Sequence, residues 1–118
     1  VRSGHKDHGR QNQIEGKMEP GTKVVVIEDL ISTGGSVLEV VDVLRQAGAQ
    51  VLGIASIFTY GLQKGVERLA AADVVNYSLS DFDTLSKVAA AEGYIADKDI
   101  AKLTAFQKNP QDPAWMEL

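Results

Sequence analysis

Two adjacent carboxylates and a glycine-rich loop lie close together early in the chain. The stretch VVVIEDLISTGGS, residues 24–36, places Glu28 and Asp29 after an apolar run and just before Thr33-Gly34-Gly35-Ser36. Backbone N–H groups of such a loop, at the start of a helix, favour a phosphate dianion. Two carboxylates would repel a phosphate alone, but they accept hydrogen bonds from vicinal ribose hydroxyls. The combination therefore predicts a site for a sugar phosphate.

The loop by itself is a weak signal. Residues 32–36 are equally consistent with an ordinary turn between a strand and a helix, with Ser36 as the helix N-cap. The sequence lacks the GxxxxGK[ST] pattern of a Walker loop and the GxGxxG pattern of a dinucleotide site. The acid pair favours the sugar-phosphate interpretation.

Several cationic or potentially cationic residues precede this stretch, and three of them, Arg2, Lys6 and His8, lie within seven residues. Most such charges belong to solvated surface loops. Beside a sugar-phosphate site, however, cations on a closing loop can neutralise a charged leaving group and exclude water.

The pattern around these residues predicts alternating strands and helices. Strands are expected at residues 23–28 and 51–58, buried on both faces, with a weaker strand at 74–79. Helices are expected at about residues 36–48, 62–70, 80–93 and 97–109, with Ser80 and Asp97 as caps of the last two.

This order predicts an α/β fold, a Rossmann-like parallel sheet flanked by helices on both faces. Residues 1–20 are expected to be a mobile catalytic loop, 21–109 the α/β core and 110–118 a docking tail. Three strands are few for this architecture. We therefore expect the chain to be the C-terminal part of a longer domain, with Val1 and Arg2 ending a strand that begins outside it.

Composition narrows the function classes. The net charge of -4 gives no indication of nucleic-acid binding, and the absence of cysteine excludes disulfides and thiolate metal sites. No apolar run approaches the roughly 20 residues that span a membrane. A cytoplasmic location is the default expectation.

The acid pair and loop closely resemble the phosphoribosyl pyrophosphate (PRPP) motif of the type I phosphoribosyltransferases. Within that family, Lys6-Asp7-His8-Gly9 is similar to the catalytic loop of the orotate phosphoribosyltransferases. The stretches IFTYGL and SLSDFDTLSKVAAAEGYI are also similar to those enzymes. The resemblance covers nearly the whole chain and corresponds to the C-terminal half of the family's fold.

The resemblance implies transfer of the 5-phosphoribosyl group from PRPP to orotate, in pyrimidine biosynthesis. It implies Mg²⁺ held mainly through PRPP, with no metal ligand assigned in the chain, and a homodimer with shared active sites. Lys6 and Asp29 are the implied catalytic residues, and Ser32 is the implied orotate contact. The implied PRPP-binding residues are Arg2, Lys6, His8, Glu28, Asp29, Leu30, Ile31, Ser32, Thr33, Gly34, Gly35 and Ser36.

Two departures and two alternatives accompany the resemblance. Ser3 stands where a second basic residue often follows the loop arginine, and the stretch Phe58-Thr59-Tyr60 lacks the arginine that some members use for the base. A purine phosphoribosyltransferase is one alternative, disfavoured by the Lys6-Asp7-His8-Gly9 loop. A non-catalytic PRPP-binding regulator is the other, and such a protein should lack the cationic loop.

Overall fold

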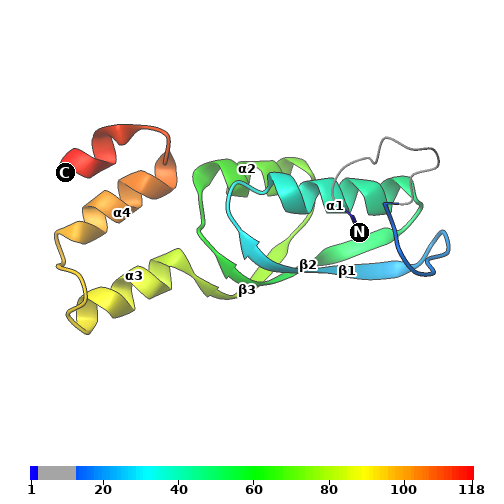
Figure 1. Ribbon diagram of the computed structural model, residues 1–118, viewed down its shortest axis with the longest axis horizontal. Helices are drawn as coiled ribbons and strands as arrows, with labels where there is room; N and C mark the ends of the chain where they lie inside the picture. Colours follow the sequence, from blue (N-terminus) through cyan, green and yellow to red (C-terminus); the bar gives the residue numbers. More distant parts are fainter. Residues whose placement is uncertain (3–12) are drawn as a thin grey trace.

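The computed structural model describes residues 1–2 and 13–118. Its elements are β1 (Lys23–Ile31), α1 (Gly35–Gln46), β2 (Gln50–Thr59), α2 (Gln63–Ala71), β3 (Asn76–Asp81), α3 (Phe82–Ala91), α4 (Asp99–Lys108) and the 3-10 helix η1 (Pro113–Glu117). The expected order of strands and helices is confirmed (Figure 1). Within the described residues, no helix combines the length and apolar character needed to cross a membrane.

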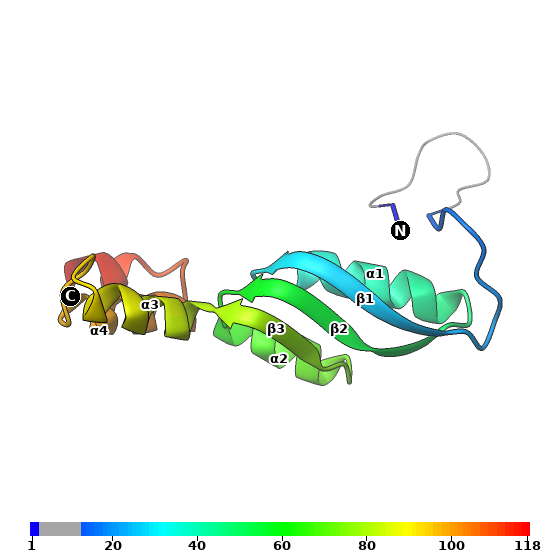
Figure 2. The same ribbon diagram turned by 90° about the horizontal axis from the view of Figure 1, so that it is seen from below.

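The three strands form a parallel sheet in the order β1-β2-β3. Because each strand is added on the same side of the last, the two right-handed crossovers place their helices on one face. Figures 1 and 2 show α1 and α2 lying together on that face. The α/β class with a parallel sheet is thus confirmed, whereas the expected cover of both faces is not seen in the described residues.

The core lies between this helical layer and the sheet. Val26 of β1 and Ile54 of β2 are partners in the strand register and are 6% and 1% exposed. They pack with Val37, Val41 and Leu44, which recur on one side of α1. The predicted apolar side of this helix is therefore the side that packs on the sheet.

The opposite face of the sheet is open to solvent in the described structure. Ile27 of β1 is 77% exposed and Leu79 of β3 is 87% exposed. Other large exposed side chains of the sheet are Val25 of β1, Ile57 of β2 and Tyr77 of β3. The strands expected to be buried on both faces are therefore buried on one, since strand order puts both crossover helices on the same side.

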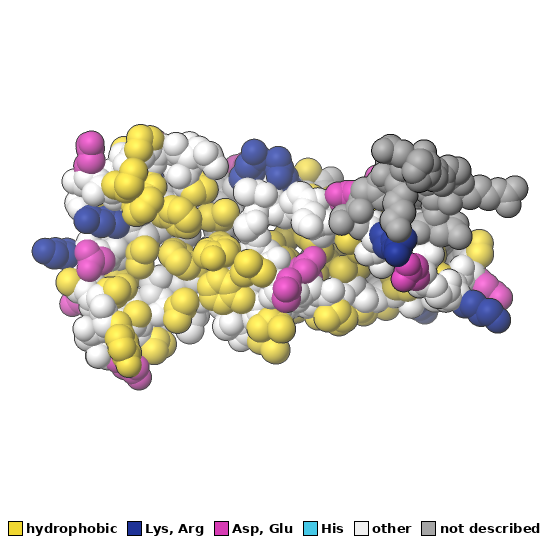
Figure 3. Space-filling model, viewed as in Figure 1, with side chains coloured by type: hydrophobic (Ala, Val, Ile, Leu, Met, Phe, Trp, Pro, Cys, Tyr) yellow, Lys and Arg dark blue, Asp and Glu magenta, His cyan; other side chains and the backbone are white. Residues whose placement is uncertain are grey.

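A chain of aromatic rings joins the sheet to the C-terminal helices. In chain order the rings are those of Phe58, Tyr60, Phe82, Phe106 and Trp115. The centroids of successive rings lie 5.3, 5.7, 6.0 and 5.4 Å apart. Trp115 thereby docks the tail on α4. Figure 3 shows hydrophobic side chains gathered over this end of the molecule.

Two helix starts differ from the sequence prediction. The N-cap of α3 is Asp81, whose carboxylate accepts a 2.7 Å hydrogen bond from the Thr84 N–H. Ser80 is not available for this role because its hydroxyl donates to the Ile57 carbonyl and keeps it within β3. α4 begins at Asp99 with Lys98 as N-cap, so the predicted Asp97 cap is wrong.

The start of the chain also differs from the sequence prediction. Val1 and Arg2 are not in a strand, and the Arg2 N–H donates to the Gln13 carbonyl at 2.6 Å. The predicted strand end at these residues is therefore not observed.

The two faces of β2 supply a matched test of the core. We expect Ile54→Ala to lower the free energy of unfolding by about 2–5 kcal/mol, because it leaves a cavity in the packed layer. Ile57→Ala, on the open face three residues later, should cost well under half as much because Ile57 is already 58% exposed. Urea denaturation of both variants checks this. Equal losses would contradict the one-sided core.

Candidate functional site

The acid pair lies near the carboxyl end of β1, where open parallel sheets bind their ligands. β1 continues to Ile31, past the expected end at residue 28, because Leu30 and Ile31 pair with Phe58 and Thr59 of β2. The Tyr60 N–H also donates to the Ile31 carbonyl at 3.0 Å. Only a short loop then separates the acids from the start of α1.

Gly34 forms the junction between this loop and α1. Its φ of +83° is left-handed, which favours glycine, and its carbonyl accepts from the Leu38 N–H at 3.0 Å. α1 starts at Gly35, so Ser36 lies inside the first turn and the alternative with Ser36 as N-cap is wrong. In the described structure no side chain caps this helix, which leaves its first N–H groups for water or an anion.

The two carboxylates fold back onto the strand. The Asp29 N–H donates to Glu28 Oε1 at 3.1 Å, and the Leu30 N–H donates to Asp29 Oδ1 at 2.8 Å. Burial raises the pKa of the Glu28 carboxyl, and its hydrogen bond with the Asp29 side chain raises it further. The hydrogen bond from the Asp29 N–H lowers this pKa by less, and the charge of Asp29 adds the smallest increase. The site thus disfavours negative charge at Glu28 and would gain from hydroxyl donors.

Helix α2 lies against the other side of the loop. A Cβ at Gly65 would stand 2.6 Å from the Ser32 carbonyl oxygen, so only glycine fits without a shift. One turn further, Arg68 Nη1 donates to the Thr33 carbonyl at 3.3 Å. Neither residue was predicted from the sequence to belong to the site. The sequence indicates them only by their spacing of three residues, which puts both on one side of α2.

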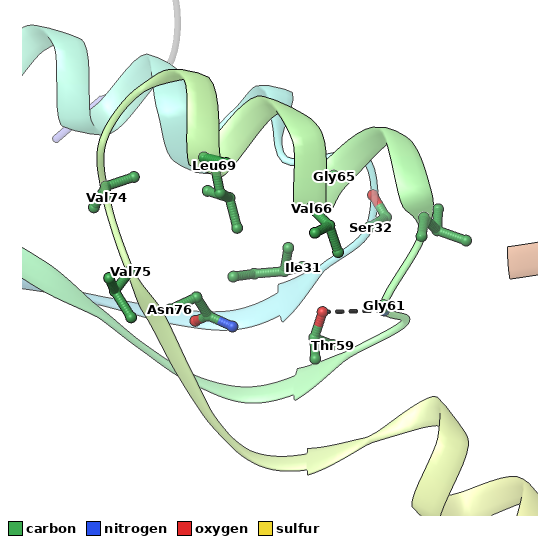
Figure 4. A pocket seen from close by; sticks show the side chains of 12 residues that line it. Ile31, Ser32, Thr59, Gly61, Gly65, Val66, Leu69, Val74, Val75 and Asn76 are labelled. Atoms are coloured by element: carbon green, nitrogen blue, oxygen red, sulfur yellow. Dashed lines mark hydrogen bonds between the residues drawn. The ribbon is translucent and has the colours of Figure 1, made fainter. Parts of the chain in front are cut away.

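A cavity of about 360 Å³ lies between α2 and the sheet, lined mainly by apolar side chains such as Leu69 and Val74 (Figure 4). Ile31 points into it from β1 and is 3% exposed, so this predicted PRPP contact is buried in the described structure. Beside this cavity, Ser56 hydrogen-bonds to Asn76 and Ser78 across neighbouring strands.

The structure therefore brings together residues 28–36, with Asp29, Leu30, Ser32, Gly35 and Ser36 exposed. Lys6 and His8 lie outside the described residues. Arg2 forms a 2.7 Å ion pair with Glu15 rather than with the acid pair. Among the described residues, no group of three or more acidic or histidine side chains could hold a metal ion.

Residues 2–89 match the family model for the phosphoribosyl transferase domain. The chain is 59% identical over 116 residues to the orotate phosphoribosyltransferase of Bacillus cytotoxicus, and 58% identical to that of Bacillus cereus strain B4264. Each alignment covers 98% of this chain and 55% of the relative. The chain thus spans about half the length of these curated relatives.

Solved structures of related enzymes are also similar to this chain. Leishmania donovani UMP synthase aligns with a TM-score of 0.66 and 26% identity, over 80% of this chain and 21% of that one. Mycobacterium tuberculosis orotate phosphoribosyltransferase aligns with a TM-score of 0.58 and 32% identity, over 69% of this chain and 46% of that one.

The raised pKa of Glu28 predicts a pH-dependent stability. When a folded carboxyl has a raised pKa, its ionised form destabilises the fold above that pKa, and the effect vanishes below the unfolded value of about 4.3. Glu28→Gln should therefore raise the urea midpoint at pH 7, and the gain should shrink to nothing as the pH falls through this window. Glu19→Gln, at an exposed acid before β1, is the control. A gain that grows at low pH would contradict the direction.

Proposed function

Because the chain belongs to the phosphoribosyl transferase domain family, we propose that it carries the PRPP-binding part of an orotate phosphoribosyltransferase. The reaction transfers the 5-phosphoribosyl group of PRPP to orotate, and it yields orotidine 5′-monophosphate and pyrophosphate. One observation carries the proposal: the carboxylate pair of β1 and the uncapped start of α1 lie at the same edge of the sheet. The identity to orotate phosphoribosyltransferases along 98% of the chain supports orotate as the acceptor.

The 5-phosphate would bind at residues 33–36. The left-handed Gly34 turns the backbone into α1, and the first N–H groups of this helix are without a side-chain cap in the described structure. The partial positive charge of a helix N-terminus favours a dianion there. The hydroxyls of Thr33 and Ser36 add two donors.

The ribose would bind at Glu28 and Asp29. Their carboxylates can accept hydrogen bonds from the two ring hydroxyls, which holds the sugar with its anomeric carbon toward the leaving pyrophosphate. As the bond to pyrophosphate breaks, positive charge develops on the sugar. Two nearby carboxylates stabilise that charge more than they stabilise the neutral ground state.

Mg²⁺ fits this arrangement as a companion of PRPP. The two adjacent carboxylates offer oxygen ligands, the kind that Mg²⁺ takes, next to a cation that would be carried mainly by the pyrophosphate. When bound, Mg²⁺ offsets the negative charge of the phosphates. Glu28 and Asp29 are the residues that would hold the ribose hydroxyls beside it.

Lys6 and His8, with Arg2, are proposed to neutralise the pyrophosphate from the segment that precedes β1. To do so, Arg2 must leave its ion pair with the exposed Glu15 and pair with the pyrophosphate instead. Ser32, exposed at the end of β1, is the proposed contact for orotate. We also propose a homodimer in which this segment acts on the neighbouring subunit.

The defining experiment uses the complete product of the gene, with PRPP and Mg²⁺. We expect orotidine 5′-monophosphate and pyrophosphate from orotate, and no nucleotide from adenine, guanine or hypoxanthine. Nucleotide formed from a purine base instead would favour the purine alternative. PRPP binding without any product would favour the non-catalytic regulator.

In the same protein, Asp29→Asn should lower kcat by about 100-fold or more, because it removes charge that stabilises the transition state. Its unfolding midpoint should change little, since the side chain is exposed. Asp42→Asn, at an exposed acid of α1, is the matched control and should keep normal turnover. Near-normal turnover in Asp29→Asn would overturn the assigned role.

A shared active site predicts subunit complementation. Lys6→Ala and Asp29→Asn should each be nearly inactive alone, whereas a mixture should regain up to about a quarter of the activity. This expectation follows because a random mixture makes half heterodimers, each with one intact site. Native mass spectrometry of differently tagged subunits checks exchange. Exchange without recovered activity would show that Lys6 acts within its own subunit.

A further inference from the structure

The loop at residues 32–36 rests on helix α2 through its carbonyl groups. Gly65 is buried, and a Cβ there would stand 2.6 Å from the Ser32 oxygen. A Cβ at Gly34 would lie 3.7 Å from both Gly65 Cα and the Gly65 oxygen. Figure 4 shows Ser32 beside Gly65 on α2. The two backbones are thus in direct contact.

Arg68 adds a polar contact to this backbone packing. Its Nη1 donates to the Thr33 oxygen at 3.3 Å across 35 residues of sequence. The same atom would lie 3.5 Å from a Cβ at Gly35, the first residue of α1. A guanidinium charge therefore lies directly beside the loop, in a half-buried position.

The direction of these carbonyls fixes the direction of the N–H groups. In a trans peptide the carbonyl and the following N–H point to opposite sides of the same plane. When the Ser32 and Thr33 oxygens face α2, the N–H groups of Thr33 and Gly34 must face away from it. These two N–H groups therefore point toward the opposite side of the loop, where Gly35 and Ser36 are exposed.

We propose that Arg68 is a positioning residue for phosphate recognition. Its hydrogen bond to the Thr33 oxygen holds the Thr33–Gly34 peptide with its N–H outward, and its charge strengthens the attraction of the loop for a dianion. Arg68 acts through the loop and need not touch the ligand. The inference rests on the proposed function, since it takes residues 33–36 as the site of the 5-phosphate.

The chain contains a matched control for the same kind of bond. Arg45 of α1 donates to the Ala72 oxygen at 2.6 Å and to the Asp73 oxygen at 3.2 Å. This arginine also joins a helix to backbone carbonyls, but it lies near the C-terminal end of α1, away from the loop. A purely structural role for Arg68 should resemble that of Arg45.

The experiment compares Arg68→Met, Arg68→Lys and Arg45→Met in the complete gene product. Affinity for ribose 5-phosphate and for inorganic phosphate is measured by calorimetry without PRPP or orotate. We expect Arg68→Met to weaken both by about tenfold and to raise the KM for PRPP similarly, with kcat within about threefold. Arg68→Lys, which keeps a charge and a donor, should recover most of the affinity. Arg45→Met should bind like the wild type.

Each outcome bears on the proposal separately from the enzyme assay. Unchanged phosphate affinity in Arg68→Met would overturn it, as would equal losses in Arg68→Met and Arg45→Met. If Arg68→Met does not fold, Arg68→Gln, which is polar but uncharged, is measured instead. Weakened affinity for both ligands in it supports the role, and wild-type affinity overturns it. A wild-type protein that binds phosphate at this loop but makes no orotidine 5′-monophosphate would refute the proposed reaction and leave this test intact.

Discussion

The approach of α2 to the loop after β1 is the constraint on which the site depends. The backbone of Gly65 lies so close to the Ser32 oxygen that a Cβ at residue 65 would have no room. This close contact fixes the direction in which the loop points its carbonyl groups. Helix α2 is in turn placed by the crossover from β2 to β3, and Leu69 of this helix packs against the core. The position of a candidate phosphate site on β1 is thus set by the packing of a helix that follows β2.

Local patterns were sufficient to predict the elements and the acid pair with its loop. The apolar runs, the helical spacing of Val37, Val41 and Leu44, and the proximity of Glu28 to Gly34 are all features of neighbouring residues. The open face of the sheet could not be predicted in this way. Alternation indicates that a strand has two faces, but the strand order decides which of them the crossover helices cover.

Contacts between distant parts of the chain explain the other differences. Arg68 meets Thr33 across 35 residues, and nothing in its own neighbourhood indicates that partner. Ser80 matched a capping pattern, yet its hydroxyl found the Ile57 carbonyl 23 residues away, which left the cap to Asp81. In both cases a hydrogen bond between residues far apart in the sequence decided the outcome, and local patterns do not indicate such partners.

The electrostatics of the acid pair favour a role in binding over a role in stabilising the fold. Glu28 is partly buried beside Asp29, and the raised pKa of its carboxyl means that the folded chain disfavours the ionised form of this side chain. The core around Ile54 is well packed and can offset such a local cost. Hydroxyl donors from a sugar would relieve it, because they supply the hydrogen bonds that burial takes from the carboxylate. A carboxylate whose charge is unfavourable in the described structure would therefore gain more from the hydroxyl donors of a sugar than a fully solvated carboxylate would.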